Sequence, residues 1–123
     1  KGGKQEDVLY VDSGRPLREV IDYLAQKHIG LALVIAADGD LAGVISERDA
    51  IRALYEHGGQ ALDLRVDMFM VRDVVTCAAD DRVVDVARVM AERKFRHMPV
   101  VDDGYLAGMV SATDLVRYFA ARL

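Results

Sequence analysis

The sequence predicts an α/β (α+β) fold built from two half-domains of the same design. The first reason is an internal repeat. The stretch DGDLAGVISERDAIRAL at 38–54 returns as DGYLAGMVSATDLVRYF at 103–119, with identical residues at eight of the seventeen positions. The second is that apolar residues at helical spacing alternate with short β-branched runs in both copies. The third is an Asp-Gly pair between two apolar runs in each copy, which is typical of a hairpin turn.

In the first copy, residues 8–11 are a short β-branched run that predicts a strand. A helix is expected next, with Pro16 suited to its first turn, because apolar residues stand at i, i+3, i+4 and i+7: Leu17, Val20, Ile21 and Leu24. The apolar runs 31–35 and 41–45 predict buried strands on either side of a turn at Asp38-Gly39. The copy closes with a helix whose apolar side holds Ala50, Ile51 and Leu54.

The second copy repeats this order. Residues 74–77 predict a strand, and a helix should follow because the same spacing returns at Val83, Val86, Ala87 and Met90. The runs 98–101 and 106–110 predict buried strands around the turn Asp103-Gly104. The apolar side of the last helix holds Leu115, Val116 and Phe119.

The repeat also predicts the domain organisation. We expect a first motif at 1–60, a linker at 61–68 and a second motif at 69–123. Each motif is then a small three-stranded sheet with two helices, which leaves a large apolar face uncovered. Two copies can cover each other's face, so a pseudo-two-fold axis is expected between them.

Composition excludes some classes of function. The net charge of −4 offers no general attraction to nucleic acid or an anionic membrane, and no apolar run approaches the roughly 20 residues of a membrane span. The lone Cys77 cannot form an internal disulfide, which suits a reducing, cytoplasmic location. No metal-ligand spacing, nucleophile set, Walker loop or GxGxxG stands out, so we expect neither an enzyme nor a metal site.

Two Ser-x-x-Asp sequences, 46–49 and 111–114, directly precede the last helix of each copy. One interpretation is a helix capping box, with Asp in place of the usual Glu or Gln. This interpretation explains both residues without a ligand. It does not exclude a ligand, because a helix N-terminus with unpaired N–H groups also suits a phosphate.

The duplicated Gly-h-h-Ser-x-x-Asp after an Asp-Gly turn, with HMPVVD at 97–102 and FMVRDVVT at 69–76, resembles the cystathionine β-synthase (CBS) domain pair, or Bateman module. The resemblance covers nearly the whole chain and is closest to small stand-alone bacterial members, through Ser-Glu-Arg-Asp at 46–49. It implies a regulatory, energy-sensing module that binds an adenosine-containing ligand in clefts between the motifs. The ligands it implies are AMP, ADP, ATP, NAD(H) or S-adenosylmethionine.

The resemblance also implies which residues form the two pockets, each drawn from both copies. The first comprises Val44, Ser46, Arg48 and Asp49 together with Met70, Val75, Thr76, Phe95, Arg96, His97 and Pro99. The second comprises Met109, Ser111, Thr113 and Asp114 together with Leu9, Tyr10, Ile29, Gly30 and Leu33. Within them, a carboxylate would repel phosphate but can accept hydrogen bonds from a ribose diol, so we assign ribose to Asp49 and Asp114. We assign phosphate binding to Ser46 and Arg48.

The basic cluster Arg93, Lys94, Arg96 and His97 has two interpretations. It can be a solvated helix end, where cations favour the helix dipole. Alternatively, Arg96 makes a forked phosphate contact and His97 makes binding pH-sensitive. Because the first copy has Gly30 and Leu31 at the positions of Arg96 and His97, unequal pockets are expected, and the pocket that contains Arg48, Arg96 and His97 is favoured as the nucleotide site.

The expected partners are a small nucleotide, a second copy in a homodimer, and a regulated enzyme or transporter. An alternative function is a dimerisation or interaction scaffold with vestigial pockets, formed by the helix faces around Ile51, Leu54, Val116 and Phe119.

Overall fold

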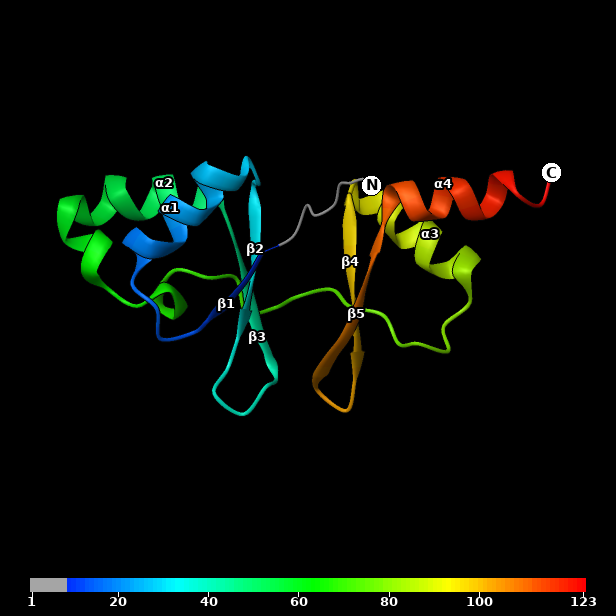
Figure 1. Cartoon of the computed structure of the whole chain (residues 1–123), viewed down its shortest axis with the longest axis horizontal. Coiled ribbons are helices and arrows are strands. Elements are labelled where there is room, and N and C mark those ends of the chain that lie inside the picture. Colours follow the sequence, from blue (N-terminus) through cyan, green and yellow to red (C-terminus); the bar gives the residue numbers. More distant parts are fainter. Residues whose placement is uncertain (1–8) are drawn as a thin grey trace. The chain divides into compact units, whose positions relative to one another are not determined.

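The computed structural model describes residues 9–123. The chain divides into two compact units, with the boundary in the sequence between Val74 and Val75. In each unit the two α-helices lie on one face of that unit's own sheet (Figure 1). This arrangement is the α+β architecture expected from the repeat. No helix in this described part of the chain is long and apolar enough to cross a membrane.

The first unit contains β1 (Leu9–Asp12), α1 (Leu17–Lys27), β2 (Leu31–Ile35), β3 (Leu41–Ser46) and α2 (Glu47–His57). The sheet order is β1-β2-β3, with β1 parallel and β3 antiparallel to the central β2. The expected apolar face of α1 is confirmed, because Leu17, Val20 and Leu24 are buried. The core of the first unit consists of Val11, Leu17, Val20, Leu24, Ala32, Val34, Ile45, Ala50, Ala53, Ala61 and Val66.

The segment after α2 packs on the first unit. It forms two 3₁₀ helices, η1 (Gly58–Asp63) and η2 (Val66–Met68), and buries Ala61 and Val66 completely in the first core. The backbone N–H of Val66 donates to the carbonyl of Arg15 at 2.7 Å. The stretch that the sequence suggests as a linker is therefore a structured part of the first unit.

The first unit ends with a strand-like contact on β3. Val71 and Val44 exchange both backbone hydrogen bonds, at 2.7 and 2.9 Å, in an isolated antiparallel bridge. Gly43 permits this approach, because a Cβ atom there would lie 2.6 Å from the Val71 carbonyl oxygen. Residues 70 and 71 are thus held against the outer edge of β3.

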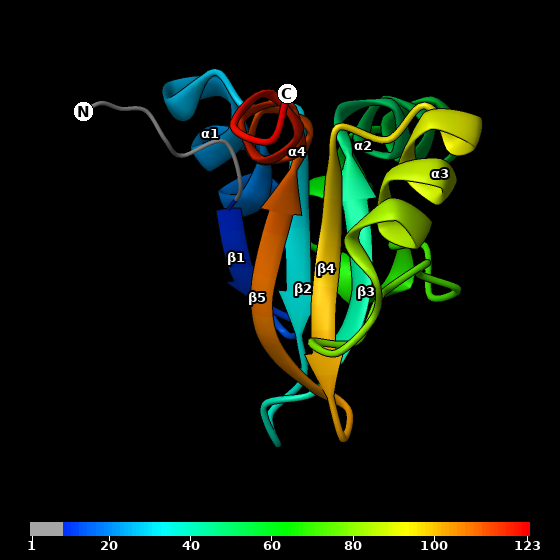
Figure 2. The same ribbon diagram turned by 90° about the vertical axis from the view of Figure 1, so that its right-hand side faces the viewer.

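The second unit contains α3 (Val83–Arg93), β4 (His97–Asp102), β5 (Tyr105–Ser111) and α4 (Ala112–Ala120). Strands β4 and β5 form an antiparallel hairpin, which Figure 2 shows from the side that carries α3 and α4. Both Asp103 and Gly104 have positive φ, as a type I′ turn requires, so the predicted hairpin turn is confirmed. The core consists of Cys77, Val86, Met90 and Met98, and burial raises the pKa of the Cys77 thiol.

The prediction of a strand at 74–77 is wrong. The second copy therefore has a two-stranded sheet and not the expected three-stranded sheet. Only Cys77 pairs, in a single parallel bridge with Val100. Its N–H donates to the Pro99 carbonyl at 2.9 Å and its carbonyl accepts from Val101 at 2.8 Å. The next ladder bond toward Val75 would need an N–H at position 99, and proline has none. In the first unit Leu33 takes that place and β1 is a full strand.

The predicted apolar sides of the last helices are only partly buried. Ala50 is buried and Leu115 packs against the second core, as expected. Ile51 is 67% exposed and Val116 is 68% exposed, so these two side chains point away from the cores of their own units.

Candidate functional site

The two Ser-x-x-Asp sequences are complete capping boxes at the starts of α2 and α4. In the first, the Ser46 N–H donates to Asp49 Oδ2 at 2.9 Å, and the Asp49 N–H donates to Ser46 Oγ at 3.2 Å. In the second, the corresponding bonds of Ser111 and Asp114 are both 3.0 Å. The capping interpretation is therefore confirmed for both copies.

The two carboxylates differ in how much of their bonding capacity the cap uses. Asp49 is buried, accepts a second bond from Ser46 Oγ at 3.0 Å, and has Arg52 3.4 Å from its other oxygen. The Asp114 side chain is 55% exposed, with Arg117 3.8 Å away. The hydrogen bonds from Ser111 lower the pKa of Asp114, helped by Arg117 and His97, so this carboxylate is ionised at neutral pH.

The first box lies beside the start of β2. Leu31 pairs with Ser46, and the N–H of Glu47 donates to the Gly30 carbonyl at 3.0 Å. Arg48 is exposed in the first turn of α2 and has no ion-pair partner among residues 9–123. Since Arg52 is already paired with Asp49, Arg48 is the cation left available at this helix start.

The second box lies beside the start of β4, with the same register. His97 pairs with Ser111, and the N–H of Ala112 donates to the Arg96 carbonyl at 2.9 Å. The Arg96 side chain is exposed and, within the described residues, has no carboxylate partner. The structure thus places two of the predicted phosphate-site residues, Arg96 and His97, next to the Ser–Asp box of their own copy.

The remaining predicted site residues fall in both units. In the first unit, Met70 packs near Gly43 beside Val44. Four other predicted positions lie on β1 or before β2: Leu9, Tyr10, Ile29 and Gly30. Leu33 lies on β2 and is completely buried, so its side chain is not exposed to a ligand. In the second unit, Val75 and Phe95 pack on the core, Pro99 pairs with Met109, and Thr76 and Thr113 are exposed. The predicted combination of residues from both copies in each pocket stays a prediction.

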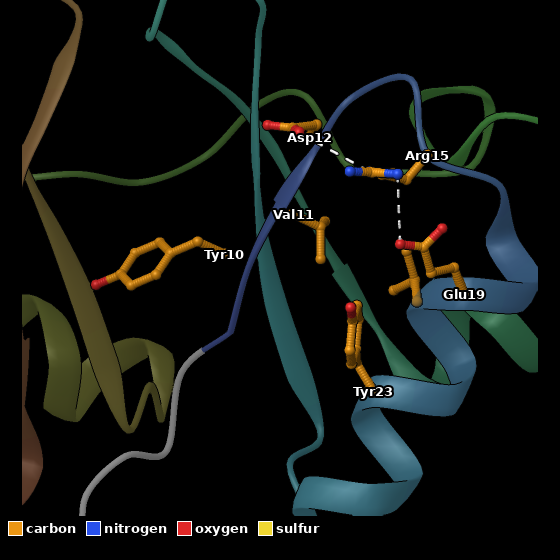
Figure 3. Close-up of a pocket in the computed structure, with 7 residues that line it drawn as sticks. Tyr10, Val11, Asp12, Arg15, Glu19 and Tyr23 are labelled. Carbon is orange, nitrogen blue, oxygen red and sulfur yellow. Dashed lines mark ion pairs between the residues drawn. The ribbon is translucent and has the colours of Figure 1, made fainter.

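Sequence reasoning missed a pocket of about 160 Å³ between β1 and α1. Figure 3 shows Arg15 between two carboxylates, with its guanidinium 3.9 Å from Asp12 and 3.6 Å from Glu19. The i,i+4 spacing of Arg15 and Glu19 could have predicted the ion pair that lines this pocket. Because both carboxylates already neutralise this arginine, the pocket does not offer a free cation to a phosphate.

Similar proteins share the repeat and the fold. The family model of the CBS domain matches twice, at residues 5–56 and 65–121. An uncharacterized protein of Methanocaldococcus jannaschii, MJ1225, is 32% identical over 92% of the chain, which spans 40% of that protein's length. The mitochondrial CBS domain-containing protein CBSX3 of Arabidopsis thaliana is 31% identical over 80% of the chain, which spans 50% of it.

Two solved structures support the same assignment. The CBS-domain containing protein ATU1752 from Agrobacterium tumefaciens is 32% identical, with a TM-score of 0.71 over 98% of this chain and 87% of that one. The CBS domain pair of protein MJ0100, solved with 5′-methylthioadenosine and S-adenosyl-L-methionine, is 25% identical, with a TM-score of 0.71 over 97% and 93%. The chain described here belongs to the CBS-domain family and carries a tandem pair of CBS domains.

Proposed function

We propose that this CBS pair is a cytoplasmic regulatory module that binds an adenosine-containing ligand, with AMP, ATP and NAD(H) as the first candidates. The observation that carries the proposal is the presence of an exposed arginine without an ion-pair partner, within the described residues, beside each Ser–Asp box: Arg48 and Arg96. Guanidinium groups at a helix N-terminus suit a phosphate, because the helix dipole and the charge act in the same direction. The adenosyl ligands of the MJ0100 pair support an adenosine group.

The ribose is assigned to the aspartates of the boxes. A diol donates hydrogen bonds, and an ionised carboxylate accepts them. The hydrogen bonds from Ser46 and the ion pair with Arg52 already engage both oxygens of Asp49, whereas Asp114 is more exposed. We therefore expect ribose binding at Asp114 to be stronger than at Asp49, which gives the two boxes unequal affinities.

Calorimetric titration of the purified chain with AMP, ATP, NADH, S-adenosylmethionine and adenosine tests the proposal. Arg48→Gln and Arg96→Gln should each weaken the binding of a phosphate-bearing ligand roughly 10- to 150-fold at the affected box, since one charge-assisted hydrogen bond contributes about 1.5–3 kcal/mol. Adenosine should bind these variants as it binds the unchanged chain. Arg88→Gln is the matched control, because Arg88 pairs with Asp85 on the exposed side of α3.

The proposal fails if no adenosine compound binds. The phosphate assignment fails separately if AMP and adenosine lose the same affinity in Arg48→Gln and Arg96→Gln. An effect of Arg88→Gln equal to theirs would show a general charge effect and would also contradict it.

A dimerisation scaffold is the second candidate, favoured by the exposed apolar side chains on the last helices. Ile51, Val116 and Phe119 are 67%, 68% and 40% exposed, and apolar exposure on a helix face is typical of an interaction surface. Sedimentation of Ile51→Lys and Val116→Lys tests it. A dimer that these changes dissociate, in a chain that binds no nucleotide, favours the scaffold over the sensor.

A further inference from the structure

The two Ser–Asp boxes differ in charge at two neighbouring positions that the repeat makes equivalent. One position precedes β2 or β4, and it holds Gly30 in the first unit and Arg96 in the second. The other position begins the last helix, and it holds Glu47 and Ala112, respectively. In both units the N–H of the helix residue donates to the carbonyl of the residue before the strand, at 3.0 Å in the first unit and 2.9 Å in the second. The backbones are therefore equivalent, and the two units differ here in their side chains.

In the first unit the Glu47 carboxylate lies over Gly30. A Cβ atom added to Gly30 would be 3.2 Å from Glu47 Oε1, so the glutamate would have to move before position 30 could carry a side chain. Glu47 is exposed, and it forms no ion pair with any residue in the described range 9–123. The first copy thus places a negative charge where the second copy combines the small Ala112 with the positive charge of Arg96.

The charges at the two helix starts are unequal as a result. Two carboxylates, Glu47 and Asp49, stand in the first turn of α2, whereas Asp114 is the one acidic residue in the first turn of α4. Each box also has one exposed arginine without an ion-pair partner among the described residues, Arg48 or Arg96. The first box therefore has one negative charge more than the second. Because each further phosphate makes a ligand more negative, a ligand with several phosphates is repelled more strongly at the first box.

We propose that Glu47 determines ligand specificity at the first box, which takes an adenosine monophosphate and discriminates against adenosine ligands with two or three phosphates. The second box accepts these ligands. This specificity rests on the proposed function, since both boxes must bind an adenosine ligand. Arg48 holds one phosphate at the first box, and Glu47 repels the charge of every further phosphate group. A carboxylate in the first turn also stabilises the helix dipole, but that structural role alone would leave the discrimination between ligands unchanged.

NMR titration of the full chain with AMP and with magnesium-free ATP tests the specificity, because the amide signals of Arg48 and Thr113 report on the two boxes separately. In Glu47→Gln, the affinity of the first box for ATP relative to AMP should rise about threefold or more, and added salt should reduce this gain. In Ala112→Glu, the same ratio should fall at the second box. Glu56→Gln is the matched control, because Glu56 is exposed near the other end of α2 and the variant loses the same charge.

Failure of the specificity and failure of the proposed function give different results. If neither box responds to AMP, ATP or adenosine, the proposed function is wrong and the specificity with it. If the second box binds but the first does not, or if the ratio of ATP to AMP affinity is unchanged in Glu47→Gln, only the role of Glu47 is overturned. A Glu56→Gln variant that changes the ratio as much as Glu47→Gln also overturns it, because the effect would then depend on net charge and not on position.

Discussion

The two Ser–Asp boxes contain the same residues, but their aspartates lie in different surroundings. Asp49 is buried in the first turn of α2 and engaged through both oxygens, whereas Asp114 is half-exposed. A cap whose carboxylate is buried loses more when that group is removed, because the N–H of Ser46 is then left without an acceptor. The difference follows from packing, since the two motif sequences do not distinguish the aspartates.

We expect Asp49→Ala to lower the free energy of unfolding by about 1–2 kcal/mol, in the range of a lost N-terminal cap. Asp114→Ala should cost less than about 1 kcal/mol, because its carboxylate is exposed to solvent. Urea denaturation of both variants measures the difference. Equal losses would show that the burial of Asp49 adds nothing to the cap.

The lowered pKa of Asp114 predicts an acid-sensitive contribution to stability. The hydrogen bonds from Ser111 hold the folded pKa below the unfolded value of about 3.9, so the stabilisation is fully present above about pH 5. It is lost as the pH falls through the folded pKa. The stability difference between the chain and Asp114→Asn should therefore be constant from pH 7 to about 5 and shrink below about pH 4. Urea denaturation at several pH values checks this, and a difference that grows toward acid contradicts it.

At the scale of elements, proline at position 99 decides whether a third strand forms. The sequence predicts strands at the starts of both copies, and only the first is a full strand. Its partner position, Leu33, has an N–H, and Pro99 does not. Periodicity and β-branching alone could not reveal this, because the missing donor belongs to the neighbouring strand.

Pro99→Leu should therefore extend the pairing of residues 75–77. The new N–H at position 99 can donate to the Val75 carbonyl, and the amide at 99 should become protected from exchange. NMR measurement of amide exchange tests the protection of the amide at position 99. Val101 is the internal control because its N–H already donates to the Cys77 carbonyl. Rapid exchange of the new amide would show that something other than the missing donor ends the strand.

At the scale of the whole molecule, the two units have cores of unequal size. Eleven buried residues form the first core and four the second, so less apolar surface stabilises the second unit. The segment 58–71 contributes to this difference, because Ala61 and Val66 pack on the first core only. The repeat therefore yields two units of one design with cores of unequal size.

We expect the amides of β4 and β5 to become exchangeable at lower urea concentration than those of β2 and β3, as a smaller core opens more easily. Native-state hydrogen exchange across a urea series measures both sheets in one experiment. Identical dependence on urea in the two sheets would mean that the units open together, and would contradict the prediction.

The sequence by itself determined the repeat, the helices, both hairpins and the two capping boxes, because these depend on local spacing and turn chemistry. Tertiary structure decided that the segment after α2 packs on the first unit, that residues 74–77 form one bridge, and that Asp49 is buried while Asp114 is exposed. Those features depend on hydrogen-bond partners and neighbours far away in the chain. The spacing of residues along the sequence does not show which distant partner lacks a hydrogen-bond donor or which side chain is buried by its neighbours.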